Sequence, residues 1–236
     1  MAPPAELLAR EEALLDYCEE SEHPGFLAFW EAKNYFVVLG YGKHLSAEVY
    51  EEECKRLAVP ILRRASGGGT VVQGPGCLNY TLILPIDSAP ELESITTTNR
   101  YIMEKTGGAL APLVIGDVRV EGHTDLTIDG RKFSGNAQRR KRRCLLFHGS
   151  FLLNFDLDRI YRTLRMPQQQ PDYRASRPHA EFVTNLNIKS DDVEKALTNA
   201  WNVTEDAAPE LTEEINNRAK TLIQAKYGRD DWNRRI

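Results

Sequence analysis

Long apolar runs are absent from this sequence of 236 residues. None approaches the roughly 20 consecutive apolar residues that a membrane-spanning helix needs, so we expect no membrane partner. The N-terminal segment, MAPPAELLAREEALLDYCEE, is acidic and lacks a basic region followed by an apolar core. That pattern argues against a secretory signal and against a transit peptide. Together these absences predict a cytoplasmic protein.

Cysteine and net charge are both low. The four cysteines, Cys18, Cys54, Cys77 and Cys144, are widely spaced and form no C-x-x-C pair. This spacing is typical of reduced thiols and argues against both a disulfide framework and a zinc site. The net charge of −4 argues against a nucleic-acid partner, because general nucleic-acid binders are usually basic.

The composition is that of an ordinary globular protein. Hydrophobic residues make up 42% of the chain and charged residues 27%, so disorder is not the default. The sequence contains no internal repeat and no low-complexity linker. A chain of this length can bury one full core, and we therefore expect a single domain over residues 1–236.

Hydrophobic periodicity predicts an α+β fold. Apolar residues at helical spacing alternate with short β-branched or aromatic runs. We expect Ser46 to cap the second helix, Gly107-Gly108 to end the third, and residues 166–178 to form a surface loop. Helices before, between and after the strands indicate a mixed sheet flanked by helices, not a doubly wound parallel sheet. The predicted helices are 4–22, 46–58, 90–106, 157–164, 191–201 and 211–227, and the predicted strands are 26–30, 35–39, 70–72, 80–84, 114–115, 118–120, 125–128, 132–135, 144–147 and 150–153.

The stretch from Arg63 to Pro85, RRASGGGTVVQGPGCLNYTLILP, is the most informative part of the chain. Three consecutive glycines, Gly67–Gly69, precede a β-branched run, and Gly74-Pro75-Gly76 turns that run into a second one. Two interpretations fit the glycines. They form a tight hairpin or bulge, or they let successive backbone N–H groups converge on an anion such as a phosphate. Arg63 and Arg64 favour an anionic ligand, because guanidinium groups suit carboxylate and phosphate.

A second stretch, Gly122–Ser150, carries Lys132 just after a hairpin signal at Asp129-Gly130. With the small residues Ser134-Gly135 beyond it, this lysine can project over a cleft and meet a phosphate or a developing oxyanion. It can equally be an exposed hairpin lysine. Asp125 is either a strand-end carboxylate near Lys132 or a surface charge.

Two further features of this stretch also have two interpretations. His148-Gly149 lies within an apolar run, as a polar group in a pocket wall or as a core histidine with satisfied hydrogen bonds. The basic run Arg139–Arg143, RRKRR, is either a solvated turn between strands or a docking patch for an acidic protein partner. Nuclear targeting is a third, weaker interpretation of the basic run.

Taken together, these stretches resemble the lipoate–protein ligase family, within the biotin/lipoate ligase and acyltransferase group. The likeness covers nearly the whole chain, and ordered motifs in this number are far more specific than any single glycine run. The motifs are Arg63-Arg64, Ser66–Gly69, Thr70–Val72, Gly76–Asn79, Asp125-Leu126, Gly130–Ala137, His148–Leu153, Val183–Leu186 and Lys226-Tyr227 with Trp232-Asn233.

The resemblance implies both a fold and a reaction. The fold is class II synthetase-like, a mixed sheet flanked by helices. In the reaction, lipoate or octanoate is activated with ATP to an acyl-adenylate, and the acyl group then passes to a lysine of a lipoyl carrier domain. Carriers of this kind are the glycine cleavage H protein, the E2 component of a 2-oxoacid dehydrogenase, or a related lipoate-binding protein.

The resemblance also implies site residues. Lys132 is the catalytic candidate, neutralising charge on the α-phosphate and the carbonyl. Mg²⁺ would screen the triphosphate, with no side chain assigned as its ligand. Val71–Val72 and Phe151–Leu153 line an acyl tunnel or pack in the core. The residues expected to bind substrates are Arg64, Gly67, Gly68, Gly69, Thr70, Val71, Val72, Gln73, Asn79, Asp125, Ser134, Gly135, His148 and Gly149.

Three departures from the family pattern bear on mechanism. Gln73 stands where the family has a histidine, and an amide does not titrate near neutrality. Relatives that act through a cysteine thioester carry that cysteine just ahead of the Asp125 position, where Asp117–Thr124 has none. Two-domain relatives add a C-terminal accessory domain, which we do not expect here because the sequence stops at Ile236. These options follow: a stand-alone ligase, a ligase with a separate accessory subunit, or a transferase that needs no ATP.

The missing nucleophile favours ATP-dependent ligation. The alternative is an octanoyl or lipoyl transferase that uses a carrier-bound acyl donor, with Cys77 or Cys144 as its nucleophile. Both cysteines are expected to be buried small hydrophobes. A third hypothesis is a carrier-binding protein without activity, for which Gln73 is the hint.

Overall fold

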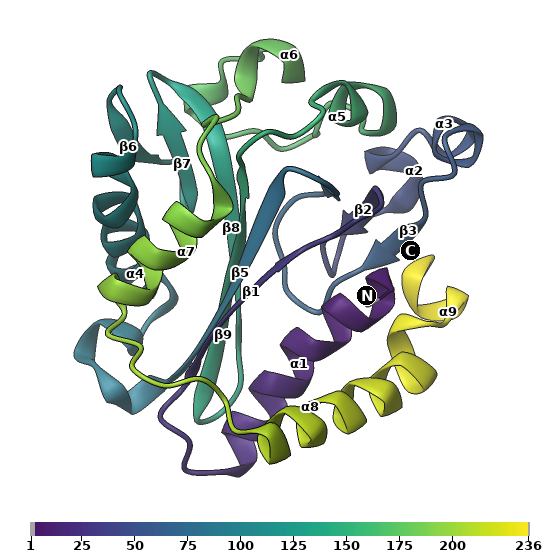
Figure 1. Cartoon of the computed structure of the whole chain (residues 1–236). Helices are drawn as coiled ribbons and strands as arrows, with labels where there is room; N and C mark the ends of the chain where they lie inside the picture. Colours follow the sequence, from purple (N-terminus) through teal and green to yellow (C-terminus); the bar gives the residue numbers. More distant parts are fainter. Residues whose placement is uncertain (1–2, 236) are drawn as a thin grey trace.

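The computed structural model describes residues 3–235 as two β-sheets with helices packed around them (Figure 1). The helices are α1 (Pro4–Glu20), α2 (Leu45–Glu48), α3 (Glu51–Arg56), α4 (Ile95–Leu110), α5 (Asp158–Thr163), α6 (His179–Phe182), α7 (Ser190–Ala200), α8 (Pro209–Leu222) and α9 (Asp230–Asn233). The strands are β1 (Phe26–Glu31), β2 (Phe36–Leu39), β3 (Ile61–Arg63), β4 (Val71–Gln73), β5 (Cys77–Pro85), β6 (Val118–Glu121), β7 (Asp125–Ile128), β8 (Arg131–Arg140) and β9 (Cys144–Leu152).

The two sheets differ in pairing. The large sheet has the order β1-β5-β9-β8-β7-β6 and every neighbouring pair is antiparallel. The small sheet has the order β3-β2-β4, with β2 parallel to β3 and antiparallel to β4. The predicted α+β fold with mixed pairing flanked by helices is therefore confirmed, and the parallel pair lies in the small sheet. The apolar strand β2 is central there, as its sequence indicates.

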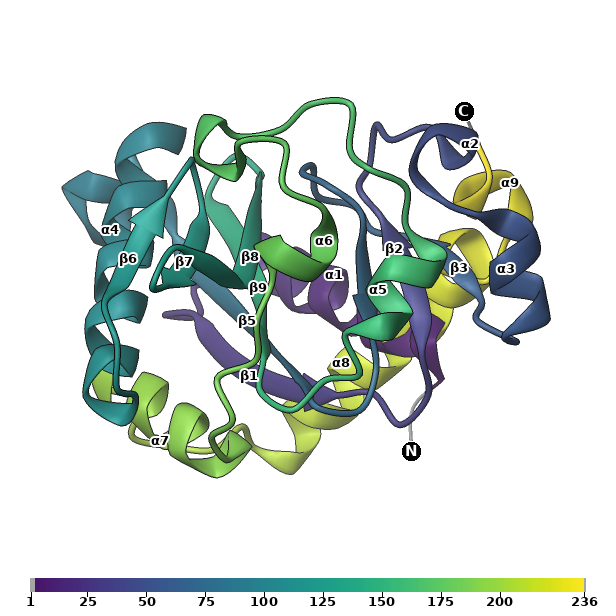
Figure 2. The same cartoon turned by 90° about the horizontal axis from the view of Figure 1, so that it is seen from above.

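Helices cover both faces of the large sheet. In Figure 1, α4 and α7 lie on one side of it, while α1 and α8 lie side by side on the other. The main core fills the first of these layers, where Met103 of α4 and Leu197 of α7 meet Phe147 of β9. Seen from above, α5 and α6 and the segment between them pass over the end of the sheets (Figure 2). Among residues 3–235, no helix combines the length and apolarity needed to cross a membrane.

The glycine-rich stretch Arg63–Pro85 does not form a hairpin, because β3 and β4 are neighbours of β2 and not of each other, and the turn at Gly74–Gly76 does not join paired strands. β4 belongs to the small sheet and β5 to the large one, so this turn carries the chain from one sheet to the other. Gly76 has φ +80°, and a Cβ there would lie 2.2 Å from the carbonyl oxygen of Asn154. The glycine is needed where two backbones approach closely, not to close a hairpin.

Two helix boundaries also differ from prediction. Helix α4 begins after Ser94, whose hydroxyl accepts from the Thr97 N–H, and it continues through Gly107-Gly108. Gly107 faces Leu126 of the sheet, so packing at close range outweighs the low helix propensity of glycine. Ser46 caps nothing. The predicted helix is split into α2 and α3, because the chain between them is extended and Val49 pairs with Leu164.

Two strand predictions are also wrong. Residues 114–115 form no strand, and the Ile115 side chain is fully exposed. His148-Gly149 does not interrupt its run, because β9 continues through both residues. The loop prediction for residues 166–178 holds apart from a single 3₁₀ turn, Asp172–Arg174.

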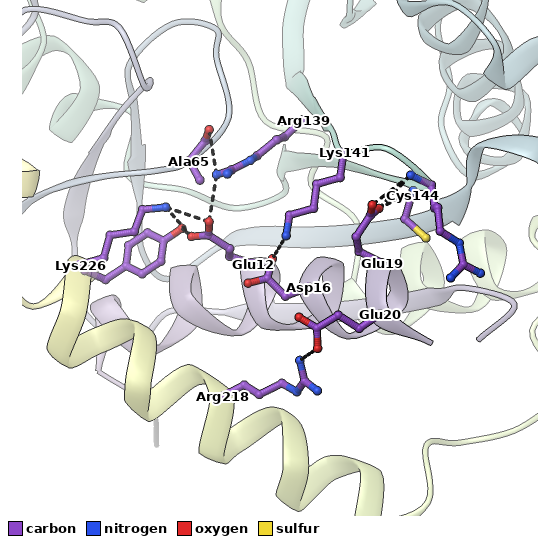
Figure 3. A network of polar contacts seen from close by, with 12 residues as sticks. Glu12, Asp16, Glu19, Glu20, Ala65, Arg139, Lys141, Cys144, Arg218 and Lys226 are labelled. Carbon is purple, nitrogen blue, oxygen red and sulfur yellow. Dashed lines mark hydrogen bonds and ion pairs between the residues drawn. The ribbon is translucent and has the colours of Figure 1, made fainter. Parts of the chain in front are cut away.

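The basic run is paired with an acidic stripe on α1 (Figure 3). Arg139 lies 3.0 Å from Glu12, and Lys141 lies 2.7 Å from Asp16. Glu19 accepts the backbone N–H groups of residues 143 and 144. Arg140 donates to the carbonyl oxygens of residues 92 and 93. Residues 139–141 thus hold α1 and the segment before α4 against the sheet, whereas Arg142 and Arg143 are exposed, and docking at the basic run stays a prediction.

Glu12 is the most buried glutamate of this acidic stripe, with 6% of its surface exposed. Its carboxylate accepts from Lys226 at 2.6 Å and from the Tyr227 hydroxyl at 2.6 Å, besides the pair with Arg139. Burial would raise the pKa of Glu12, but these partners outweigh it and hold the pKa below its ordinary value of 4.5.

Replacing Glu12 with glutamine keeps the shape and removes the charge that offsets two partly buried cations, Arg139 and Lys226. We expect Glu12→Gln to lower the free energy of unfolding by about 3 kcal/mol at neutral pH. A lowered folded-state pKa stabilises the protein above pH 4.5, and that stabilisation is lost as the pH falls through the lowered value. Denaturant unfolding at a series of pH values should therefore show the difference between wild type and variant shrinking below pH 4.5.

The matched control is Glu20→Gln on the same helix, because Glu20 pairs with Arg218 at the surface and is 62% exposed. It should change the unfolding free energy by about 0–1 kcal/mol. Equal losses in the two variants, or a wild-type difference that does not depend on pH, would contradict this account of Glu12.

Candidate active site

A cavity of about 870 Å³ opens between the large sheet, the small sheet and α1. The segment after α5, from Arg165 to Val183, contributes its rim. Two predicted site residues, Gly67 and Ser134, are not in its wall. The predicted residues that line it are Arg64, Gly68, Gly69, Thr70, Val71, Val72, Gln73, Asn79, Asp125, Lys132, Gly135, His148 and Gly149.

The glycine loop is held from beneath by Arg64. The guanidinium donates to the carbonyl oxygens of Gly67 at 2.5 Å and Gly69 at 2.7 Å, and Nε donates to Ser66 Oγ at 3.0 Å. Burial lowers the pKa of Arg64 to about 10, so the group stays cationic at neutral pH. Since its donors are taken up by the protein, Arg64 shapes the loop.

The same contacts orient the backbone N–H groups of the loop. In a trans peptide the carbonyl and the following N–H point to opposite sides. Because the carbonyls of Gly67 and Gly69 face Arg64, the N–H groups of Gly68 and Thr70 point away from it. Gly68 and Thr70 line the cavity, and neither N–H meets a protein acceptor within residues 3–235. Two free donors on one loop form a concavity suited to an anion.

The three glycines are not equivalent. Gly68 has φ +86°, and a Cβ there would lie 2.9 Å from an Arg64 nitrogen, so the fold itself requires this glycine. A Cβ at Gly67 or Gly69 would meet nothing within 4 Å. The protein alone therefore does not explain these two glycines, and of the two only Gly69 lines the cavity.

Arg63 does not serve the loop. Its side chain is fully buried and contacts the segment that follows β2. Nη1 donates to the carbonyl oxygens of Gly40, Tyr41 and Lys43, and Nη2 donates to that of Arg235. The expectation that both arginines face an anionic ligand is wrong for Arg63, which ties the small sheet to the C-terminal segment.

Lys132 reaches the cavity and is paired there. Its Nζ lies 2.7 Å from Asp125 Oδ1, and Asp125 Oδ2 accepts from the Tyr173 hydroxyl at 2.6 Å. Asp125 is therefore the strand-end carboxylate beside Lys132, not a surface charge. A Cβ at Gly135 would lie 2.9 Å from Lys132 Nζ, so the small residue beyond the lysine makes room for its ammonium group.

A β-bulge directs Lys132 into the cavity. Leu126 pairs with Ser134 and Thr127 pairs with Lys132, which leaves Phe133 as an extra residue in β8. In a regular strand, Gly135 would share its face with residue 133. The bulge shifts that phase, so Lys132 joins Gly135 at the cavity while Phe133 packs in the main core.

His148 belongs to a buried hydrogen-bonded row. Its Nε2 lies 2.6 Å from Ser66 Oγ, and its Nδ1 lies 2.7 Å from Glu11 Oε2. Glu11 also accepts from Thr81 and Trp30. Burial would raise the pKa of Glu11, but His148 and the other two donors outweigh it and lower the pKa. His148 is thus both a cavity-wall residue and a histidine with both nitrogens satisfied.

The remaining predicted residues are held by short polar contacts. Gln73 Oε1 accepts from Asn79 Nδ2 at 2.9 Å and from the Cys77 thiol at 3.1 Å, so the amide fixes its neighbours without titrating. Gly149 pairs with Asn136, whose amide oxygen would lie 1.7 Å from a Cβ there, so this glycine is required by packing. Ser134 accepts from the Asn136 amide.

The thiols lie away from the cavity. All four cysteines are buried and free, and none of them lines the cavity in the described part of the chain. Burial raises the pKa of Cys18 and of Cys77 to about 12, and that of Cys54 to about 11. Such groups stay protonated at neutral pH and are poor nucleophiles. The position ahead of Asp125 does line the cavity, through residues 121–124.

Among the cavity residues that were not predicted, Glu11 and Tyr173 matter most, because they contact the predicted residues His148 and Asp125. Glu11 lies four residues from Leu7 and four from Leu15, so it interrupts the apolar stripe of α1, and that interruption was the available signal. Tyr173 lies in an irregular segment where no periodicity marks it. Of the predicted acyl-tunnel residues, Leu152 lines the cavity, whereas Phe151 and Leu153 pack in the main core.

Comparison with known proteins gives a consistent result. The family described as lipoyl protein ligase A/B catalytic domain matches residues 3–201. Lipoate-protein ligase A subunit 1 of Thermoplasma acidophilum is 25% identical over 241 residues, which is 96% of this chain and 90% of that protein. Octanoyltransferase LipM of Symbiobacterium thermophilum is 28% identical, covering 99% of this chain and 95% of that protein.

Solved structures show the same fold. A bipartite lipoate protein ligase from T. acidophilum superimposes with a TM-score of 0.81 at 24% identity, covering 98% of this chain and 91% of that one. A lipoate-protein ligase A bound with ATP gives a TM-score of 0.80 at 23% identity, covering 98% and 94%. The class II synthetase-like architecture is therefore confirmed. Because the family match spans most of its length, this chain belongs to the lipoyl protein ligase A/B catalytic domain family of lipoate–protein ligases and octanoyltransferases.

Proposed function

We infer that this protein is an ATP-dependent lipoate–protein ligase. It activates lipoate or octanoate to the acyl-adenylate and transfers the acyl group to a lysine of a lipoyl carrier domain. The observation that carries this proposal is the composition of one cavity. The N–H groups of Gly68 and Thr70 and the ammonium of Lys132 are available to it, and no thiol lines it within residues 3–235.

Activation places charge where this cavity has donors. A carboxylate oxygen of the acid attacks the α-phosphorus of ATP, and pyrophosphate leaves. Negative charge on the phosphoryl oxygens is met by the loop N–H groups and by Lys132, whose position Asp125 and Tyr173 hold before substrate arrives. In the second step the acceptor amine attacks the acyl carbon, AMP leaves, and Lys132 stabilises the developing oxyanion.

The residues present fit Mg²⁺ only as a companion of phosphate. Within residues 3–235, no three histidine, cysteine or acidic side chains gather closely enough to hold a metal ion by themselves. Mg²⁺ in nucleotide sites is commonly bound by one or two carboxylates together with phosphate oxygens. Besides Glu11, which contacts His148, the carboxylates of the cavity wall are Glu48, Glu121, Asp125 and Asp172, and a ligand of this kind would come from these. The acyl chain would lie along the apolar wall formed by Leu8, Trp30 and Val72.

The partner is a lipoyl carrier domain. The structure of the T. acidophilum relative is described as a bipartite ligase with its E2 lipoyl domain. By analogy, the acceptor of this enzyme is a lipoyl domain of an E2 component, a glycine cleavage H protein or a related carrier, and a separate accessory subunit completes the ligase. We propose residues 1–236 as one catalytic unit that acts in the cytoplasm.

The relatives named octanoyltransferase LipM favour a second candidate, ATP-independent transfer from an acyl carrier. That mechanism requires a thiolate nucleophile at the cavity. Burial and the raised pKa of Cys77 argue against this residue in that role. The second candidate therefore ranks below the ligase.

One experiment distinguishes the ligase from the transferase. An apo lipoyl domain incubated with the enzyme, lipoate and Mg-ATP should gain the mass of one lipoyl group, and omission of ATP should abolish the gain. A candidate accessory subunit is supplied in a parallel arm. Transfer from octanoyl-carrier protein without ATP, lost in Cys77→Ser or Cys144→Ser, would replace the ligase by the transferase.

Lys132→Ala removes the charge that meets the phosphate. We expect adenylate formation to fall by about three orders of magnitude, the size of a lost preorganised electrostatic contact. Pyrophosphate release measures this step directly. The control is Lys195→Ala on the exposed face of α7, which should match wild type. Unchanged adenylation in Lys132→Ala would remove Lys132 from the site.

The glycine loop offers a three-way test. Gly69→Ala adds a methyl group on the cavity side, and we expect normal stability with roughly tenfold weaker Mg-ATP binding. Gly67→Ala is its matched control, because that Cβ is equally free and lies outside the cavity wall. Gly68→Ala should lose about 1–3 kcal/mol of stability from backbone strain. Calorimetry and thermal unfolding measure both quantities, and equal binding by the Gly67 and Gly69 variants would contradict the proposed phosphate position.

A further inference from the structure

A continuous hydrogen-bonded row joins α1 to the glycine loop. It runs from the Glu11 carboxylate through the His148 ring and the Ser66 hydroxyl to the Arg64 guanidinium, with contacts of 2.7, 2.6 and 3.0 Å. All four residues are buried, with exposed fractions of 8% or less. Ser66 is not in the cavity wall, so this row ends beneath the loop and not at a nucleophile open to substrate.

When His148 is neutral, the donors and acceptors of the row can be matched in only one way. Arginine donates only, so Ser66 Oγ accepts from Arg64 Nε. The Glu11 carboxylate only accepts, so the ring proton sits on Nδ1 and is donated to Glu11 Oε2. Nε2 then has no proton and accepts the hydroxyl hydrogen of Ser66. Every donor and acceptor in the row is matched, which is the condition for a stable buried network.

We propose that Glu11 is a positioning residue that sets the tautomer of His148 and thereby the conformation of the glycine loop. The Arg64 group that ends the row is the one that turns the carbonyls of Gly67 and Gly69 inward. Glu11 thus acts on the outward N–H groups without touching the substrate. The proposal rests on the proposed function only for the identity of the anion that those N–H groups bind.

Glu11→Gln tests the proposal, because the direction of the new amide is dictated by its neighbours. Trp30 and Thr81 both donate to Oε1, so the amide oxygen stays there and the NH₂ group faces His148 Nδ1. Nδ1 must then accept, and the ring proton moves to Nε2. The Ser66 hydroxyl hydrogen loses its acceptor, and the support of the loop weakens.

Three quantities are measured: which ring nitrogen of His148 carries the proton, the rate of amide exchange at the loop, and the Kd for Mg-ATP. In ¹⁵N-histidine-labelled protein, the ring of His148, assigned by its loss in His148→Gln, should carry its proton on Nδ1 in wild type and on Nε2 in Glu11→Gln. Exchange at the loop is reported by the Tyr41 amide, which donates to the Ser66 carbonyl oxygen at 2.9 Å, and it should be about tenfold faster in the variant because the loop loosens. The Kd for Mg-ATP should rise about tenfold.

Glu12→Gln is the matched control. It neutralises the adjacent glutamate of the same helix and costs stability, but Glu12 contacts Lys226, Tyr227 and Arg139 instead of the row, so the His148 proton should stay on Nδ1. Ser66→Ala breaks the row beyond His148. It should speed exchange in the loop while leaving the proton on Nδ1, and it tests the loop end even if Glu11→Gln does not fold.

Each outcome bears on the proposal. The same tautomer in wild type and Glu11→Gln, a ring protonated on both nitrogens in wild type, or unchanged loop exchange in Ser66→Ala would overturn it. The tautomer and the exchange rates are measured without substrate. A tautomer shift in a protein that binds no Mg-ATP would therefore support the positioning role while counting against the ligase function.

Discussion

The cavity depends on one buried cation. The Arg64 guanidinium sits under the glycine loop, where it binds backbone carbonyls and a hydroxyl instead of a single carboxylate partner. A buried charge is tolerated only when its donors are satisfied, so the loop must fold back onto it. Because the loop carbonyls turn toward Arg64, the loop N–H groups point outward. The proposed anion site is thus shaped by a cation that need not touch the anion.

Helix α1 connects this site to the rest of the molecule. Two successive glutamates diverge from it. Glu11 contacts His148 at the cavity, and Glu12 contacts Lys226 of the C-terminal segment, as Figure 3 shows for Glu12. Both are buried, and both have a lowered pKa because their partners outweigh the cost of burial. The first helix of the chain therefore orients a cavity whose other parts come from strands far along the sequence.

Much of the fold and of the site could be predicted from the sequence, and the failures have physical causes. Local patterns place β7 and β8 and mark Lys132 because turn chemistry and strand alternation are properties of neighbouring residues. They fail where a distant segment decides the outcome. Gly107 stays helical because it packs on Leu126, and Arg63 turns away from the loop to meet the C-terminal segment. A local sequence pattern does not show which distant segment will pack against a given residue.

The bulge in β8 makes the strand less regular but directs Lys132 into the cavity. If the same residues paired evenly with β7 without the bulge, the alternation would place Lys132 on the core face with Ser134 and leave the cavity without its cation. A more regular sheet would thus remove the cation to which we assign the proposed reaction. The irregularity is the means by which one strand serves an apolar interior at Phe133 and a charged cavity at Lys132.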